Sequence, residues 1–213
     1  MSNDQMGFDL GGPRPRSPRA AGGGSAGAGK FTGENLFIAA RPDRAAAAAA
    51  RSVARDYRDL YRIDRQPLSD QRLHVSLIGL DHTPVLEQSL IYDARAAIDS
   101  VRFEPFEIKF DSVVSLRSQA SRPIALAATE PNPALRSVVM RLADKLDGLG
   151  ALPLRFKENF LVHMTLIYYD KLVMPDPLSK PISWTIDRLW LVRSLVGQGT
   201  HEFLWPPENP PVA

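Results

Sequence analysis

Two stretches of the chain, LHVSLI at residues 73–78 and VHMTLI at residues 162–167, share one pattern: an apolar residue, His, an apolar residue, a hydroxyl residue, Leu and Ile. Runs rich in Val, Ile and Leu and bounded by polar residues are typical of β-strands. Side chains of a strand point alternately to its two faces, so residues two apart share a face and lie about 6.6 Å apart. We therefore predict two strands that each present an imidazole and a hydroxyl group on the same face.

The residues of the repeated pattern are His74 with Ser76 and His163 with Thr165. If both strands border one polar cleft, a neutral imidazole can accept a proton from water while a second, protonated imidazole donates one to a leaving oxygen. The two hydroxyl groups can donate hydrogen bonds to the non-bridging oxygens of a phosphate. This combination suits the hydrolysis of a cyclic phosphodiester and needs no metal ion.

A single histidine on a strand is more often structural than catalytic. The hypothesis that His74 and His163 are catalytic therefore depends on the repetition of the pattern. The other two histidines, His82 and His201, follow or precede turn-like sequence and are predicted to lie in loops. The sequence contains no His-x-His or His-Glu-x-x-His spacing and no cysteine, so neither a metal ion nor another cofactor is expected. The absence of a Gly-x-Ser-x-Gly elbow argues against a serine hydrolase.

Outward from these stretches, strands and helices mix without the regular strand–helix alternation of a parallel sheet. This order predicts an α+β fold with mostly antiparallel strands. The apolar patterns and the capping signals predict helices at residues 43–61, 83–101 and 132–149 and strands at residues 36–40, 73–80, 106–116, 123–128, 161–169, 183–193 and 202–205.

The composition indicates an ordinary globular protein. Its 213 residues are 44% hydrophobic and 23% charged, enough for one substantial core. We expect a Gly-, Pro- and Arg-rich disordered tail at residues 1–33, one domain with two lobes at 34–206 and a flexible tail at 207–213. No apolar run is long enough to span a bilayer, so we expect a cytoplasmic protein without a membrane partner. The net charge of +2 permits an anionic partner without requiring one.

Four segments of the chain resemble the 2H phosphoesterase superfamily, in particular its 2′-5′ RNA ligase and RNA 2′,3′-cyclic phosphodiesterase group. LHVSLIGL and VHMTLIYY are similar to the two H-x-[S/T] strands of the family. LFIAARPD resembles its opening strand, and ISWTIDRLWLVRS resembles a late strand that ends in Leu-Val-Arg-Ser. The likeness extends, in order, over residues 35 to 205.

The resemblance implies a bilobal α+β fold with pseudo-twofold symmetry, in which two mostly antiparallel sheets with helices outside enclose a central cleft. It implies that His74 and Ser76 form the first motif and that His163 and Thr165 form the second. The expected reaction is hydrolysis of a 2′,3′-cyclic phosphate on an RNA end or on a small nucleotide. We expect a monomer that acts without a cofactor.

The chain departs from the family directly after the second motif, where Ile167-Tyr168-Tyr169 stands in place of the Ala-Arg of many members. A basic substrate contact expected there is therefore missing. Arg193 and Arg122 are candidates for a substitute phosphate contact, although an arginine at a strand end or in a loop is more often simply an exposed charge. Tyr168 and Phe37 are candidates for stacking on a base, although strand aromatics are usually core residues.

Two alternatives remain open on the same cleft. One is a non-catalytic RNA-binding module, and the other is a 2′-5′ RNA ligase. The sequence does not identify which histidine is the base, nor whether the substrate is polymeric RNA.

Overall fold

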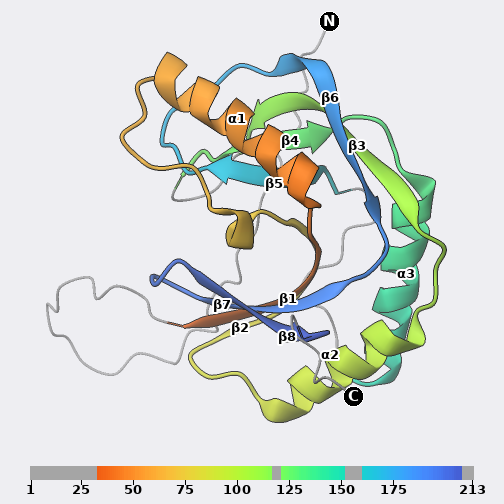
Figure 1. Cartoon of the computed structure of the whole chain (residues 1–213). Coiled ribbons are helices and arrows are strands. Elements are labelled where there is room, and N and C mark those ends of the chain that lie inside the picture. Colours follow the sequence, from red (N-terminus) through yellow and green to blue (C-terminus); the bar gives the residue numbers. More distant parts are fainter. Residues whose placement is uncertain (1–32, 117–120, 152–159, 208–213) are drawn as a thin grey trace, which may run out of the picture.

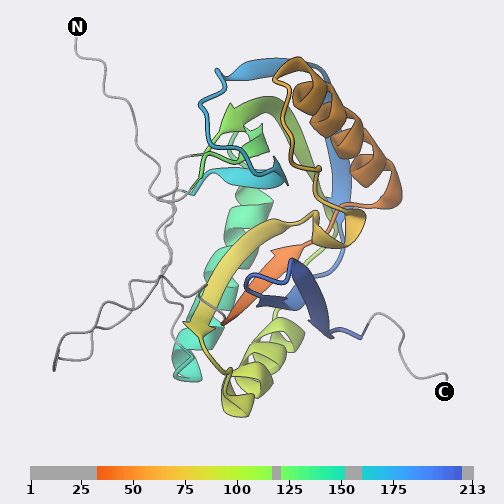
Figure 2. The same ribbon diagram turned by 90° about the vertical axis from the view of Figure 1, so that its left-hand side faces the viewer.

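The computed structural model describes residues 33–116, 121–151 and 160–207, so nearly all of the two predicted tails lies outside the described residues. Within these ranges, three helices lie around a strongly curved sheet of eight strands (Figures 1 and 2). The elements in chain order are β1 Glu34–Ala40, α1 Arg44–Leu60, the 3-10 helix η1 Asp70–Arg72, β2 Val75–Thr83, α2 Gln88–Ser100, β3 Phe106–Ser115, β4 Ile124–Ala128, α3 Pro133–Gly148, β5 Val162–Ile167, β6 Asp176–Ile186, β7 Trp190–Leu195 and β8 Thr200–Trp205.

The sheet has the order β6-β3-β4-β5-β2-β1-β7-β8, and every neighbouring pair is antiparallel. It consists of two four-stranded lobes: a first lobe of β2, β1, β7 and β8, and a second lobe of β6, β3, β4 and β5. The lobes join at one residue pair, Val75 of β2 with Met164 of β5. The predicted α+β fold with antiparallel strands is confirmed, and the two expected sheets meet edge to edge at this bridge.

One continuous core fills both lobes. Val75, Met164 and Phe110 are fully buried in it. The ring of Phe110 stacks on that of Trp184, which is also buried, with centroids 5.3 Å apart. The buried face of α1 consists mainly of alanine side chains, which are small. The Asp43 carboxylate caps the helix by accepting a hydrogen bond of 2.7 Å from the backbone N–H of Ala46.

Within the described ranges, no helix is long and apolar enough to cross a membrane.

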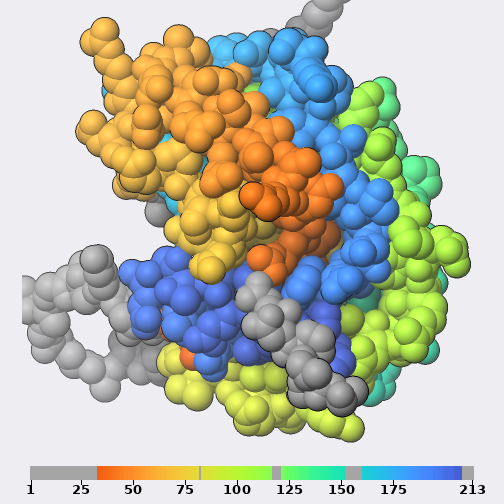
Figure 3. Space-filling view, viewed as in Figure 1, coloured from red at the N-terminus to blue at the C-terminus, as the bar shows by residue number. Residues whose placement is uncertain are grey.

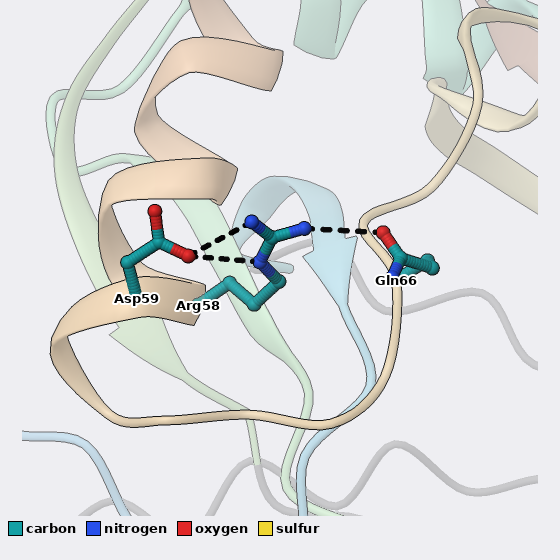
Figure 4. Close-up of polar contacts among 3 residues, drawn as sticks. All are labelled: Arg58, Asp59 and Gln66. Atoms are coloured by element: carbon teal, nitrogen blue, oxygen red, sulfur yellow. Dashed lines mark hydrogen bonds and ion pairs between the residues drawn. The ribbon is translucent and has the colours of Figure 1, made fainter.

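The segment between α1 and β2 is held at both of its ends. Near its start, Arg58 donates to the Asp59 carboxylate and, through Nη1, to the side-chain oxygen of Gln66 at 3.1 Å (Figure 4). Further on, the backbone N–H of Leu68 donates to the carbonyl of Leu166 in β5 at 2.8 Å. These contacts fix the approach of the chain to η1 and to the first histidine motif.

Strand pairing explains where the sequence-based boundaries were wrong. The strand predicted at residues 183–193 is the end of β6 and the beginning of β7, because the chain leaves one lobe at Ile186 and enters the other at Trp190. The second helix begins at Gln88 rather than near residue 83, because β2 continues to Thr83, opposite Glu34. Such boundaries depend on partners that are distant in sequence.

The two histidines predicted to lie in loops are both in strands. His82 lies in β2, and His201 lies in β8, where it pairs with Ser194 of β7. Both strands are stabilised by pairing that a local reading of the sequence does not detect.

Candidate active site

The bridge between the lobes places both histidine motifs on one face of the sheet. Paired residues of an antiparallel ladder share a face, so Val75 and Met164 point together into the core. The residues on either side of each then point to the opposite face, and these are His74, Ser76, His163 and Thr165. Because the strands run in opposite directions, His74 lies toward Thr165 and Ser76 toward His163, as expected for a pseudo-twofold axis through the bridge.

The two imidazoles are oriented in the same way. His74 Nδ1 lies 2.7 Å from the carbonyl oxygen of Arg72, and His163 Nδ1 lies 2.8 Å from that of Leu161, in each case two residues earlier. A carbonyl oxygen only accepts, so each Nδ1 donates its proton, and in the neutral ring Nε2 is then the atom that accepts one. His74 Nε2 lies 3.1 Å from the hydroxyl of Ser76, which donates to it.

Burial favours the neutral form of both imidazoles. It lowers the pKa of His74 to about 4; the bond to the Arg72 carbonyl partly opposes this shift, and repulsion from a protonated His163 and from the Arg72 guanidinium adds to it. Burial likewise lowers the pKa of His163, and the bond to Leu161 partly opposes the shift. A bound anion would act in the opposite direction, because negative charge favours the protonated ring.

A third histidine borders this site, and sequence reasoning missed it. The His201 ring lies 5.1 Å from that of His74 and 5.8 Å from that of Phe37, and the Phe37 ring lies 5.0 Å from His74. Burial lowers the pKa of His201 to about 4, with smaller contributions from His74 and Arg72. The available signal was the Gly197-Gln198-Gly199 turn between two strands, whose glycines adopt positive φ and close a hairpin.

Phe37 is therefore a neighbour of His74, and its ring packs against the imidazole. Tyr168, directly after β5, is 40% exposed, with its ring centroid 6.0 Å from the guanidinium carbon of Arg72. Arg122 extends the pairing of β4 with β5, because its backbone N–H donates to the carbonyl of Tyr169 at 2.6 Å. These three candidates lie in strands or strand extensions of the two lobes.

The structure does not bring Arg193 to the histidines. It pairs with Leu36 in the β1–β7 ladder, so its side chain lies on the sheet face opposite that of Phe37. Its guanidinium is already held by two carboxylates: Nε donates to Glu202 at 2.7 Å, and Nη1 lies 3.7 Å from Glu34. An arginine neutralised in this way is poorly suited to a substrate phosphate.

A notch opens between the segment that follows α1 and the β7–β8 hairpin in the space-filling view (Figure 3). These two parts of the chain lead to Arg72 and His201, two of the neighbours of His74 that come from outside its motif. Over the ranges that the structure describes, no group of three or more His, Asp or Glu side chains is arranged to hold a metal ion.

Two antiparallel lobes that meet at a pair of matched His-x-Ser/Thr strands define a 2H phosphoesterase. Residues 38–198 match the family model of the 2′-5′ RNA ligase superfamily, and the chain belongs to that family. The predicted resemblance is thereby confirmed. The superfamily comprises phosphoesterases and RNA ligases, which makes an enzyme the supported class of function.

Solved structures confirm the fold at low sequence identity. E. coli LigT in its apo form is 18% identical with a TM-score of 0.60, covering 81% of this chain and 94% of that one. E. coli LigT complexed with 3′-AMP is 18% identical with a TM-score of 0.61, covering 80% and 94%. TT0787 of Thermus thermophilus is 20% identical with a TM-score of 0.63, covering 80% and 94%. No curated protein matches this chain significantly in sequence.

Proposed function

We propose that this protein hydrolyses a 2′,3′-cyclic phosphate, on an RNA end or a small nucleotide, with His74 and His163 as its acid–base pair. One observation carries the proposal: two imidazoles, each fixed through Nδ1 by the carbonyl two residues earlier, lie on the same face beside the bridge. Two matched titratable groups on one face are what general acid–base catalysis requires.

The reaction proceeds by attack of water on phosphorus. A neutral imidazole takes the proton of the water as the new P–O bond forms. The protonated imidazole gives its proton to the ribose oxygen as the P–O bond to that oxygen breaks, which leaves a phosphate monoester. The hydroxyls of Ser76 and Thr165 donate to the non-bridging oxygens, where charge accumulates. When the phosphate arrives, the Ser76 hydroxyl turns from His74 Nε2 to a phosphate oxygen.

A nucleotide ligand is supported by relatives of the same fold. Crystal structures exist of E. coli LigT complexed with 3′-AMP and with ATP. We propose that this chain also takes a nucleotide, with its phosphate at the two histidines.

The test is turnover of a 2′,3′-cyclic nucleotide and of a short RNA with a 2′,3′-cyclic end, in excess chelator, with identification of the monoester formed. His74→Ala and His163→Ala should each lower kcat by about 10²- to 10⁴-fold, as is typical when acid–base catalysis is lost. Arg188→Met, an exposed change outside the site, is the control. Wild-type turnover by the double His variant would refute the proposal.

The family name favours a second candidate, 2′-5′ RNA ligation on the same cleft. Incubation with two RNA halves separates it from hydrolysis, because ligation yields a longer product. Tight binding of a cyclic-phosphate oligonucleotide without turnover would instead indicate a binding module.

A further inference from the structure

Arg72 lies where the two lobes meet, beside the first histidine motif. It is the last residue of η1, and its carbonyl oxygen holds Nδ1 of His74. Its guanidinium faces the β7–β8 turn, since a Cβ placed on Gly199 would lie 3.5 Å from Nη1. The ring centroid of Tyr168 lies 6.0 Å from Cζ. The cation therefore has neighbours from both lobes.

The guanidinium lies near the site. Its Nη1 faces Gly199, two residues before His201, and the carbonyl of the same arginine holds Nδ1 of His74. Its charge also contributes to the lowered pKa of both His74 and His201. In the described part of the chain, no carboxylate forms an ion pair with Arg72, whereas Arg193 is held by Glu202 and Glu34.

The guanidinium also has an unused donor. Its Nε is buried without a hydrogen-bond partner. A buried donor of a charged group is costly to leave without an acceptor. A planar guanidinium can bind two oxygens of one phosphate, and it keeps its charge at all relevant pH values.

We propose that Arg72 is the phosphate-binding residue of this site, its guanidinium donating to the oxygens of the substrate phosphate beside His74. The inference rests on the proposed function. Arg72 would supply the basic contact that is missing after the second motif. The residue in that region is Tyr168, and its ring lies near the Arg72 guanidinium. Arg72 binds and orients the phosphate and exchanges no proton.

The experiment measures binding of inorganic phosphate to the full chain by calorimetry, in wild type, Arg72→Met, Arg72→Lys and Arg188→Met. Arg72→Met should weaken phosphate binding by about 10- to 100-fold, the effect of losing charge-assisted hydrogen bonds. Arg72→Lys should retain part of the affinity, because the charge remains while the paired geometry is lost. Arg188→Met removes the same charge from an exposed site and should leave affinity unchanged.

Binding without turnover separates this inference from the proposed function, since phosphate can bind even if no cyclic phosphate is hydrolysed. Where turnover is seen, Arg72→Met should raise KM more than it lowers kcat. His74→Ala should do the reverse and mainly lower kcat. A folded Arg72→Met protein that binds phosphate as tightly as wild type overturns the inference.

A second measurement needs no variant. Phosphate should protect Arg72 of the wild-type protein from phenylglyoxal, an arginine reagent, with the modified residue located by mass spectrometry. Equal modification of Arg72 with and without saturating phosphate also overturns the inference.

Discussion

The surroundings of His74 come from two kinds of sequence relationship. Its contacts with the Arg72 carbonyl and the Ser76 hydroxyl are local, two residues away in either direction. Strand alternation predicts that Ser76 shares its face, and the structure places it there. Its contacts with Phe37 and His201 depend on the pairing of β2 with β1 and of β7 with β8, which no local pattern specifies.

At the same scale, the two hydroxyl residues should differ in effect although they occupy matched positions. Ser76→Ala and Thr165→Val should each lower kcat by about 10²-fold, the loss expected for one donor to the charged transition state. Ser76→Ala should also shift the pH–rate profile, because this hydroxyl bonds His74 Nε2 in the free protein. Steady-state kinetics from pH 5 to 9 check both effects. Unchanged kcat in both variants would remove the hydroxyls from the mechanism.

At the scale of elements, the single residue pair between β2 and β5 sets the distance between the two motifs. Met164 is fully buried opposite Val75, and its truncation leaves a cavity directly behind His163. Met164→Ala should lower the free energy of unfolding by about 2 to 5 kcal/mol. It should also lower kcat, because misplaced catalytic groups lose rate steeply with small displacements.

Leu142→Ala is the matched control, since Leu142 is equally buried but lies in α3, away from the bridge. It should cost similar stability in urea unfolding and leave kcat within a few-fold of wild type below the unfolding transition. If both variants lose the same fraction of kcat, the bridge has no special role in catalysis.

Elements with strong local signals were predicted well, and those defined by partners were not. α1 begins after Asp43 and α3 after Asn132, and the side chains of both residues cap these helices. Both helices end within a residue or so of the predicted positions. The break between β6 and β7 carries no turn signature that separates it from a bent strand. It exists because the chain changes lobes there.

At the scale of the whole molecule, stability should fall on mild acidification. The pKa of His74 is about 4 in the folded protein, below its ordinary value of 6.5, so the unfolded chain binds more protons between these values. The contribution is fully present above pH 6.5 and is lost as the pH falls toward 4. His74 alone accounts for a loss on the order of 2 to 3 kcal/mol.

Urea unfolding at pH 7.5 and pH 4.5 measures this loss. His74→Gln, which does not titrate, should show a smaller decrease than wild type between the two pH values. An equal decrease in the two proteins would mean that His74 is not buried as a neutral ring.

The fold and the family followed from the sequence because they depend on patterns repeated over most of the chain. The proposed phosphate contact did not follow from the sequence. Arg193, one of the two candidate arginines, is held by carboxylates on the other face of the sheet. Arg72, which no motif singled out, is brought to the site by η1 and the glycine turn of β7–β8.

The strand order also has a consequence for biosynthesis. The second lobe is built from strands that are contiguous in the chain, from residue 106 to 186, whereas the first lobe combines β1 and β2 with β7 and β8. During translation, β1 therefore has no second partner until β7, which ends at Leu195, has left the ribosome. A prematurely terminated chain that lacks β7 and β8 would carry both histidine motifs and still have no His201 beside His74. It would also expose an unpaired β1 edge, the kind of edge on which newly made chains aggregate.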